Sequence, residues 1–189
     1  MLKKWKLLIP LLSILLCVSC GKAPTVVPDN SRWVFPETRE EMVRTTSDIV
    51  SVKITKTTVE QLKESDLENS EDADFFIATA KVNEVLRGDM QPGQEIELIY
   101  EGDKRNKIYE WVIYNGGYPE KGTQWLLFLT SQPCFEEMDR IFYIPIINGQ
   151  YQLNDKDEIT FRTDMSKQYF NEFQTVGEMK KILDTLVLE

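Results

Sequence analysis

Carboxylates are the side chains with which this sequence could do chemistry. The chain has 189 residues, of which 31 are acidic and none is histidine. Without an imidazole, the serine–histidine–aspartate and cysteine–histidine arrangements and every histidine metal site are excluded. Two carboxylates could still hydrolyse a glycosidic bond. The nominees are Glu101 with Asp103, or Glu136 with Glu137 and Asp139, although such neighbours arise by chance in so acidic a chain.

Motifs for metals and phosphates are weak. Asn154–Glu158 begins like a calcium loop, but the sixth position counted from Asp155 is Thr160, where glycine is needed, so a polar hairpin turn is favoured. The acidic run over residues 60–74 could capture a cation, yet a solvated loop is the simpler interpretation. Gly116-Gly117 does not make a phosphate-binding loop. The sequence therefore predicts no metal, no cofactor and no enzyme activity.

The amino-terminal residues predict a secretory signal peptide. Residues 1–6 form a short basic start with three lysines, residues 7–18 form an apolar run, and small residues surround Cys20. The alternative is a membrane-spanning helix, but the apolar run is shorter than the roughly 20 residues that a bilayer requires, and Pro10 interrupts it. We therefore expect residues 1–19 to be removed.

The sequence Leu16-Cys17-Val18-Ser19-Cys20-Gly21 resembles a bacterial lipobox, with one departure: Cys17 stands where leucine is usual. The resemblance implies cleavage before Cys20 and attachment of a diacylglycerol, with acyl chains such as palmitate, to the thiol of Cys20. Stable anchoring needs two or more chains. Residues 20–35 would then form a lipidated flexible tether. Cys134 would have no cysteine partner in the mature chain, and without histidine to activate it we interpret it as a small apolar or bystander residue.

Composition restricts the partners. Apolar residues make up 42% and charged residues 28% of the chain, which is ordinary for one globular domain, expected at residues 36–189. The net charge is −9, and it becomes −12 without Lys3, Lys4 and Lys6 of the leader. So acidic a chain is unsuited to nucleic acid or to polybasic docking on anionic lipid, which agrees with a covalent anchor. The expected partners are the membrane through Cys20, and a surface protein or cell-wall ligand.

Most of the exported domain has the alternating pattern of half-buried strands. A capping box from Thr38 to Glu41 predicts a helix over residues 37–46, and a second box from Thr175 to Glu178 begins an amphipathic helix. That helix could dock on the barrel, which is the interpretation we favour, or it could bind a partner. The expected strands are 49–57, 76–86 with a bulge, 95–101, 111–114, 125–129, 142–147, 151–153 and 159–161.

Three local features refine this pattern. Trp125–Leu129 is apolar throughout, which predicts a strand covered on both sides. Asn148-Gly149 predicts a hairpin turn, and Pro145 predicts an edge strand. Exposed aromatic side chains could form a binding patch, although core packing explains most of them; the candidates are Trp111, Tyr114, Tyr118, Trp125, Tyr143 and Tyr151. The fold class is therefore mainly β with flanking helices: a small antiparallel OB-like barrel or curled sheet with a C-terminal amphipathic helix.

Five short motifs lie between Asp48 and Leu153: Asp48-Ile49-Val50, Ala80–Asp89, Pro92-Gly93, Lys121-Gly122 and Trp125–Leu129. Together they resemble a group of small membrane lipoproteins from Gram-positive bacteria. They also distantly resemble the OB-like barrel of metalloproteinase-inhibitor and netrin modules. Inhibitors of that type use a free amino-terminal cysteine on a catalytic metal, whereas an acylated Cys20 could not do so.

The leading hypothesis is a lipid-anchored, extracytoplasmic, non-catalytic binding module. Two alternatives stay open: a carboxylate-dependent cell-wall glycan hydrolase, and a surface inhibitor that binds a protein through a loop edge.

Overall fold

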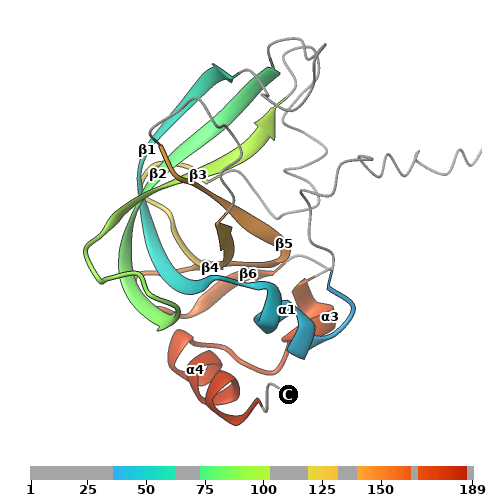
Figure 1. The fold of residues 1–189 in the computed structure, drawn as a ribbon. Coiled ribbons are helices and arrows are strands. Elements are labelled where there is room, and N and C mark those ends of the chain that lie inside the picture. The colour runs from blue at the N-terminus through green and yellow to red at the C-terminus, as the bar shows by residue number, and fades with distance from the viewer. Residues whose placement is uncertain (1–35, 63–72, 103–118, 132–139, 163–165, 187–189) are drawn as a thin grey trace, which may run out of the picture. The chain divides into compact units, whose positions relative to one another are not determined.

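A computed structural model describes residues 36–62, 73–102, 119–131, 140–162 and 166–186, all of which belong to one compact unit, Arg32–Glu189 (Figure 1). The elements in chain order are α1 (Arg39–Thr45), β1 (Asp48–Leu62), β2 (Ala73–Arg87), β3 (Glu95–Gly102), β4 (Gln124–Ser131), β5 (Phe142–Leu153), β6 (Ile159–Arg162), α3 (Ser166–Tyr169) and α4 (Val176–Thr185).

Five strands close into a barrel. The strand order is β3-β2-β1-β4-β5-β6, and a parallel pairing of β3 with β5, from Glu97 opposite Phe142 to Leu98 opposite Tyr143, joins the two sides. The other described pairings are antiparallel. A five-stranded barrel closed in this way confirms the expected mainly-β, OB-like class with a C-terminal helix.

The interior of the barrel is filled by alternate side chains of its strands. The core cluster comprises Val50, Val52, Ile54, Phe76, Ala78, Ala80, Val82, Met90, Ile96, Leu98, Tyr100, Trp125, Leu127 and Leu129. Residues between them in sequence point outward, because successive side chains of a strand lie on opposite faces. The two faces of each strand can therefore be assigned from the register.

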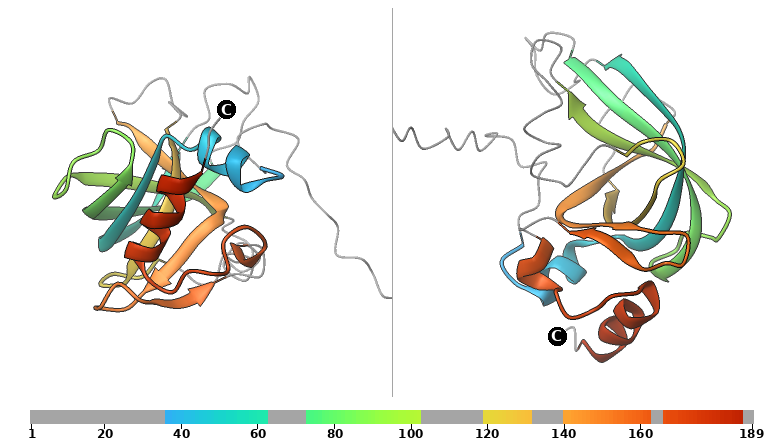
Figure 2. Two further views of the ribbon diagram at one scale, coloured as in Figure 1. Left: turned by 90° about the horizontal axis from the view of Figure 1, so that it is seen from below. Right: turned by 180° about the vertical axis from the view of Figure 1, so that it is seen from behind.

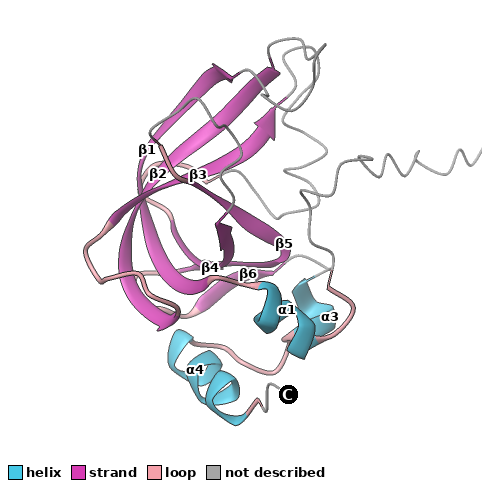
Figure 3. Ribbon diagram, viewed as in Figure 1, coloured by secondary structure: helices cyan, strands magenta, loops and turns pink. Residues whose placement is uncertain are grey.

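Helices α1, α3 and α4 cover one outer face, over β1, β4 and β5 (Figure 3). Phe128 and Leu126 point outward from β4 and pack among Met42, Phe170, Phe173 and Met179. Strand β4 is thus buried on both faces, as its unbroken apolar run predicts. The amphipathic pattern of α4 is confirmed as a docking pattern, since Val176 and Met179 are buried against the barrel. We call this surface the helix-covered face.

Both predicted capping boxes are confirmed. The Thr38 hydroxyl accepts from the Glu41 N–H at 3.1 Å, and the Thr175 hydroxyl accepts from the Glu178 N–H at 3.2 Å. In each case the glutamate carboxylate reaches back to the N–H of the residue before the cap, at 2.7 Å from Glu37 and 2.6 Å from Gln174. These bonds satisfy amide groups that a helix leaves unpaired at its start.

The predicted hairpin at Asn148-Gly149 is wrong. Strand β5 runs through both residues, and four of its residues, 146–149, face Phe128 alone, because Leu127 pairs with Gln150 and Leu129 with Pro145. A Cβ atom on Gly149 would lie 2.5 Å from the Cβ of Phe128. Glycine is therefore required by close packing in a wide bulge and not by a turn.

Two further predictions are corrected in part. Pro145 lies in an inner strand, where it pairs with Leu129 of β4, whereas β3 pairs with Phe142 and Tyr143 and β6 with residues 151–153. The two ends of the solvated loop expected at 60–74 are strand instead, since β1 continues to Leu62 and β2 begins at Ala73, and residues 63–72 lie outside the described residues. The bulge expected in β2 is confirmed, and register shifts leave Asn83 and Leu86 as its extra residues.

Candidate functional site

The outward side chains of β1, β2 and β3 form a second outer face, distinct from the helix-covered face. Figure 2 shows the three strands side by side. Their register places the following residues outward: Lys53, Lys56, Thr58, Glu60, Phe75, Ile77, Thr79, Lys81, Glu95, Glu97 and Ile99. We call this surface the β1–β2–β3 face. In OB barrels, ligands bind on the face of strands 2 and 3, between the loops that follow strands 1 and 4.

Arg140 occupies the centre of an ion cluster on this face. Its Nε and Nη2 donate to the two carboxylate oxygens of Glu97 at 2.7 and 2.6 Å, and its Nη1 donates to Glu60 at 2.8 Å. The guanidinium also lies 4.8 Å from the ring centroid of Phe142. Arginine makes such planar two-point contacts with carboxylates while stacking on an aromatic ring. Three strands, β1, β3 and β5, are therefore linked at one point.

The pKa values of Glu60 and Arg140 are both shifted in the direction that favours the charged form. Hydrogen bonding from Arg140 is the main reason why the pKa of Glu60 lies below its ordinary value. Hydrogen bonds to Glu97 and Glu60 raise the pKa of Arg140 above its already high value. Arg140 and Glu60 are therefore both charged at neutral pH. A glycosidase needs a carboxylic acid with a raised pKa, and Glu60 has the opposite shift.

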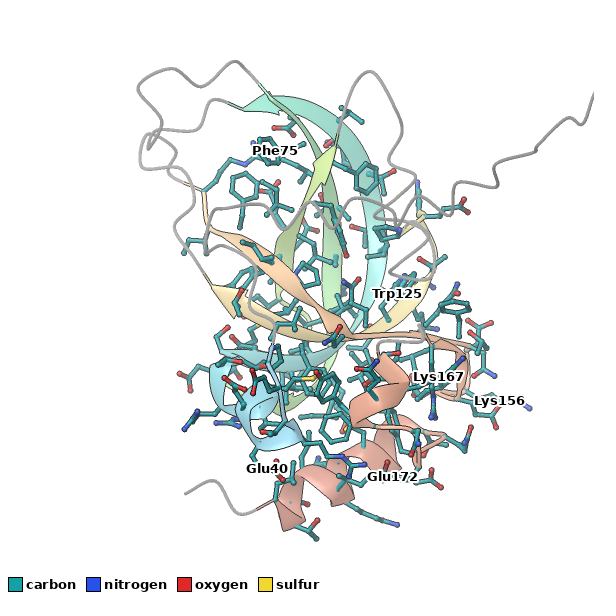
Figure 4. The ribbon with its side chains drawn as sticks, turned by 90° about the vertical axis from the view of Figure 1, so that its right-hand side faces the viewer. Glu40, Phe75, Trp125, Lys156, Lys167 and Glu172 are labelled. Carbon is teal, nitrogen blue, oxygen red and sulfur yellow. The ribbon has the colours of Figure 1, made fainter. Side chains whose placement is uncertain are left out.

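Apolar side chains surround the ion cluster. Phe75, Ile77 and Ile99 point outward and yet are buried, and they belong to neither of the two core clusters. Phe142, at the closing pair of the barrel, is also buried. Figure 4 shows Phe75 far from Glu40 and Glu172, which lie in the helical layer. Arg140, Glu60 and Glu97 keep about a third of their side-chain surface exposed, at 31%, 33% and 30%.

The helix-covered face contains a matching arginine. Arg39 donates to both carboxylate oxygens of Glu172, at 2.5 and 2.9 Å, and its guanidinium lies 5.1 Å from the ring centroid of Phe170. This pair joins α1 to the residues after α3. The Tyr169 hydroxyl donates to the Pro36 carbonyl at 2.6 Å, so the same region also holds the chain just before α1. Arg39 thus has an evident structural role and is a natural control for Arg140.

Two of the segments that resemble small lipoproteins, Asp48-Ile49-Val50 and Ala80–Asp89, are in contact with each other in the structure. The Oδ1 atom of buried Asp48 accepts from the N–H groups of Asp89 and Met90, at 3.0 and 3.2 Å. Gly88 has a φ of 104°, and a Cβ there would overlap the Asp48 carboxylate. Aspartate and glycine in these two segments therefore fasten the end of β2 to the start of β1. They are structural residues.

The aromatic patch predicted from the sequence is not supported for the three of its residues that the structure describes. Trp125 and Tyr151 are buried in the two core clusters, and Tyr143 is half-buried against the barrel interior. Several other nominated residues lie outside the described residues: Cys20, Cys134, Asp103, Glu136, Glu137, Asp139, Trp111, Tyr114 and Tyr118. Of Glu101, the structure describes only the backbone, in β3.

Sequence reasoning missed the Arg140 cluster. Arg140 lies 80 residues from Glu60 and 43 from Glu97, so no local spacing connects them.

Among the described residues, no group of histidine, cysteine or acidic side chains is arranged to hold a metal ion. Across the same residues, none of the helices has the length and apolarity needed to cross a membrane.

Comparison with models of protein families finds no match, and a search of curated proteins also finds none.

Proposed function

We propose that this protein is a lipid-anchored, extracytoplasmic binding module without catalytic activity, and that its ligand contacts the β1–β2–β3 face. The lipobox-like sequence supports the anchor. The Arg140 cluster supports the binding face and is the observation that carries the proposal. It combines a partly exposed guanidinium, two carboxylates and an aromatic ring at the strands where OB barrels bind ligands.

The geometry of the cluster suits recognition. Each end of the guanidinium is held by a carboxylate and one of its faces by Phe142, so its orientation is fixed before a ligand arrives. Fixed side chains lose little conformational entropy on binding. The exposed parts of Arg140, Glu60 and Glu97 can contact the polar substituents of a ligand. This rigid, charged arrangement favours binding over catalysis.

The anchor is tested by intact-mass spectrometry. The full chain and a Cys20→Ala variant would be expressed in a Gram-positive host, and their membrane fractions compared. We expect the wild type to be cleaved before Cys20 and to carry the mass of a diacylglycerol, and we expect the variant to lack both changes. An uncleaved or unmodified wild-type chain would refute the anchor.

The binding face is tested by lysine footprinting. Lys53, Lys56 and Lys81 lie on the β1–β2–β3 face, whereas Lys156 and Lys181 are exposed elsewhere. An amine-reactive label would be applied to the full chain in native membranes and to the same chain after detergent purification. We expect the first three lysines to be labelled more slowly in membranes and the two reference lysines to be labelled equally. Equal labelling of all five would contradict an occupied face.

A further inference from the structure

The junction that closes the barrel is the shortest of the described pairings between its strands. Strands β3 and β5 pair at Glu97 with Phe142 and at Leu98 with Tyr143, whereas β2 pairs with β3 over all of residues 74–81. The short junction is also parallel, and parallel pairing is slightly less stable per residue than antiparallel pairing. We call this junction the β3–β5 seam. It is where two barrel strands can separate with the loss of fewest backbone pairings.

The first residues of β5 receive limited support from the rest of that strand. Pro145 has no N–H group to donate, and residues 146–149 face Phe128 alone, so the pairing of β5 with β4 is interrupted just beyond the seam. Ile141, immediately before the seam, is 66% exposed. Opening the seam would expose Phe142, which is buried, so the closed form is the major one. The arrangement permits local opening without unfolding of the remaining sheet.

Arg140 crosses the seam beside its backbone pairing. It precedes β5, and it donates two hydrogen bonds to Glu97 of β3, the residue that pairs with Phe142. Its bond to Glu60 extends the link to β1, and its guanidinium stacks on Phe142. About a third of each charged side chain is exposed, so water and salt ions compete with these bonds. The link across the seam is therefore specific but readily broken.

We infer that the β3–β5 seam opens locally and that the Arg140 cluster is the latch that keeps it closed. Opening separates Arg140 from Glu97 and so dismantles the cluster on the β1–β2–β3 face. The closed form is then the one that binds ligand, and the fraction of closed molecules scales the apparent affinity. A ligand bound across the cluster would in turn hold the seam closed. The coupling to a ligand rests on the proposed function, whereas the opening itself does not.

Hydrogen exchange of the detergent-solubilised full chain, followed by mass spectrometry, tests the opening. Residues 96–98 and 142–144 report on the seam, and residues 50–54 and 78–82 of the β1–β2 pairing report on global unfolding. We expect the seam to be less protected than the β1–β2 pairing and its exchange to depend less on urea, because local opening exposes less surface. Equal protection with equal urea dependence would overturn the inference.

Substitutions across the seam test the latch. Arg140→Gln and Glu97→Gln should each raise exchange at the seam roughly two- to fivefold, as expected for a partly exposed ion pair, and leave the β1–β2 pairing unchanged. The double variant should exchange no faster than Arg140→Gln, because both changes remove the same interaction. Arg39→Gln is the matched control, since it breaks a similar contact with Glu172 away from the seam. No change in Arg140→Gln, or an equal rise in Arg39→Gln, would overturn the latch.

Salt supplies a second readout. About 0.5 M sodium chloride should speed exchange at the seam in the wild type but not in Arg140→Gln, because salt screens exposed ion pairs. An equal effect on both proteins would refute the latch. If the seam opens as expected but the lysines of the β1–β2–β3 face are labelled equally in membranes and in detergent, the proposed function fails and the latch stands. If the lysines are protected but the seam opens only on global unfolding, the proposed function stands and the latch fails.

Discussion

The two outer faces of the barrel differ in the kinds of side chain that they carry and in how far those side chains are buried. On the helix-covered face, large apolar side chains from α1, α3 and α4 pack on β1, β4 and β5, and Phe128, Tyr151, Phe170 and Phe173 are fully or almost fully buried. On the β1–β2–β3 face, charged and apolar groups lie side by side and a third of the Arg140 cluster is exposed. The first arrangement is what stability requires.

The difference between the two faces can be followed at one arginine–glutamate pair on each of them. Arg39 and Arg140 have the same local chemistry, a two-point contact with a carboxylate and a stacked phenylalanine. Arg39 joins α1 to the segment between α3 and α4. Arg140 also engages a second carboxylate, and its partners Glu60 and Glu97 point outward from β1 and β3, on the face where ligands bind in this type of barrel. The comparison therefore predicts that one pair serves the fold and the other serves binding.

The largest effect is expected from Phe128→Ala. The ring is completely buried, with centroids 5.7 Å from that of Phe170 and 6.3 Å from that of Tyr151. Removing a buried phenylalanine ring costs about 3–5 kcal/mol, through lost transfer free energy and the cavity left behind. Urea unfolding measures this loss. Phe161→Ala, at a ring that is 40% exposed, should change stability by about 0.5 kcal/mol or less.

Gly149→Ala should be next, with a loss of about 1–3 kcal/mol. The added methyl group would lie 2.5 Å from the Cβ of Phe128 and 2.8 Å from the Cε of Met42. Gly177→Ala is the matched control, because the nearest neighbour of the added Cβ would be the Thr175 hydroxyl, 4.0 Å away. That control should stabilise the protein by about 0.4–1 kcal/mol, because alanine lowers the conformational entropy of the unfolded chain. Equal effects at the two glycines would contradict the close packing at the bulge.

Thr175→Ala should cost about 1 kcal/mol, because the Glu178 N–H loses its partner at the start of α4. Thr175→Ser keeps the hydroxyl and should retain most of the stability. Thermal unfolding of both variants measures the difference. If alanine and serine behave alike, the cap contributes nothing and the docking of α4 rests on its apolar side chains, such as Val176 and Met179.

The smallest effect concerns the Arg140 cluster, and it depends on pH. The folded state lowers the pKa of Glu60, so the ionised carboxylate favours folding above the ordinary glutamate range, near 4.5. That contribution should disappear as the pH falls through and below this range. Wild type should therefore exceed Glu60→Gln in stability at pH 7, by no more than about 1 kcal/mol for such exposed groups, and the difference should vanish in acid. A difference that grows in acid would contradict the assigned pKa shift.

Local sequence patterns predicted much of the fold. The apolar run at Trp125–Leu129 identified the doubly buried strand, and two threonine–glutamate spacings located both capped helices. These features depend on residues that are close in sequence. The turn predicted at Asn148-Gly149 failed because Phe128, which is distant in sequence, determines what Gly149 must be. Tertiary packing there outweighs the local preference for a hairpin.

The binding face was harder to predict for the same reason. Arg140, Glu60 and Glu97 come from three separate segments, and only the parallel closing pair of β3 and β5 brings them together. Lys53, Lys56 and Lys81 likewise share one face only because of the exact register of β1 and β2, which a bulge at Thr55 shifts. A shift of one residue would place one of these lysines on the opposite face.

Lysine footprinting of Arg140→Ala and Arg39→Ala in native membranes tests the central claim most directly. The labelling of Lys53, Lys56 and Lys81 would be compared with that of Lys156 and Lys181 in each variant. We predict that Arg140→Ala removes the protection of the first three lysines while the protein stays folded, and that Arg39→Ala keeps it. Protection that survives Arg140→Ala, or is lost equally in both variants, would contradict a binding face centred on Arg140.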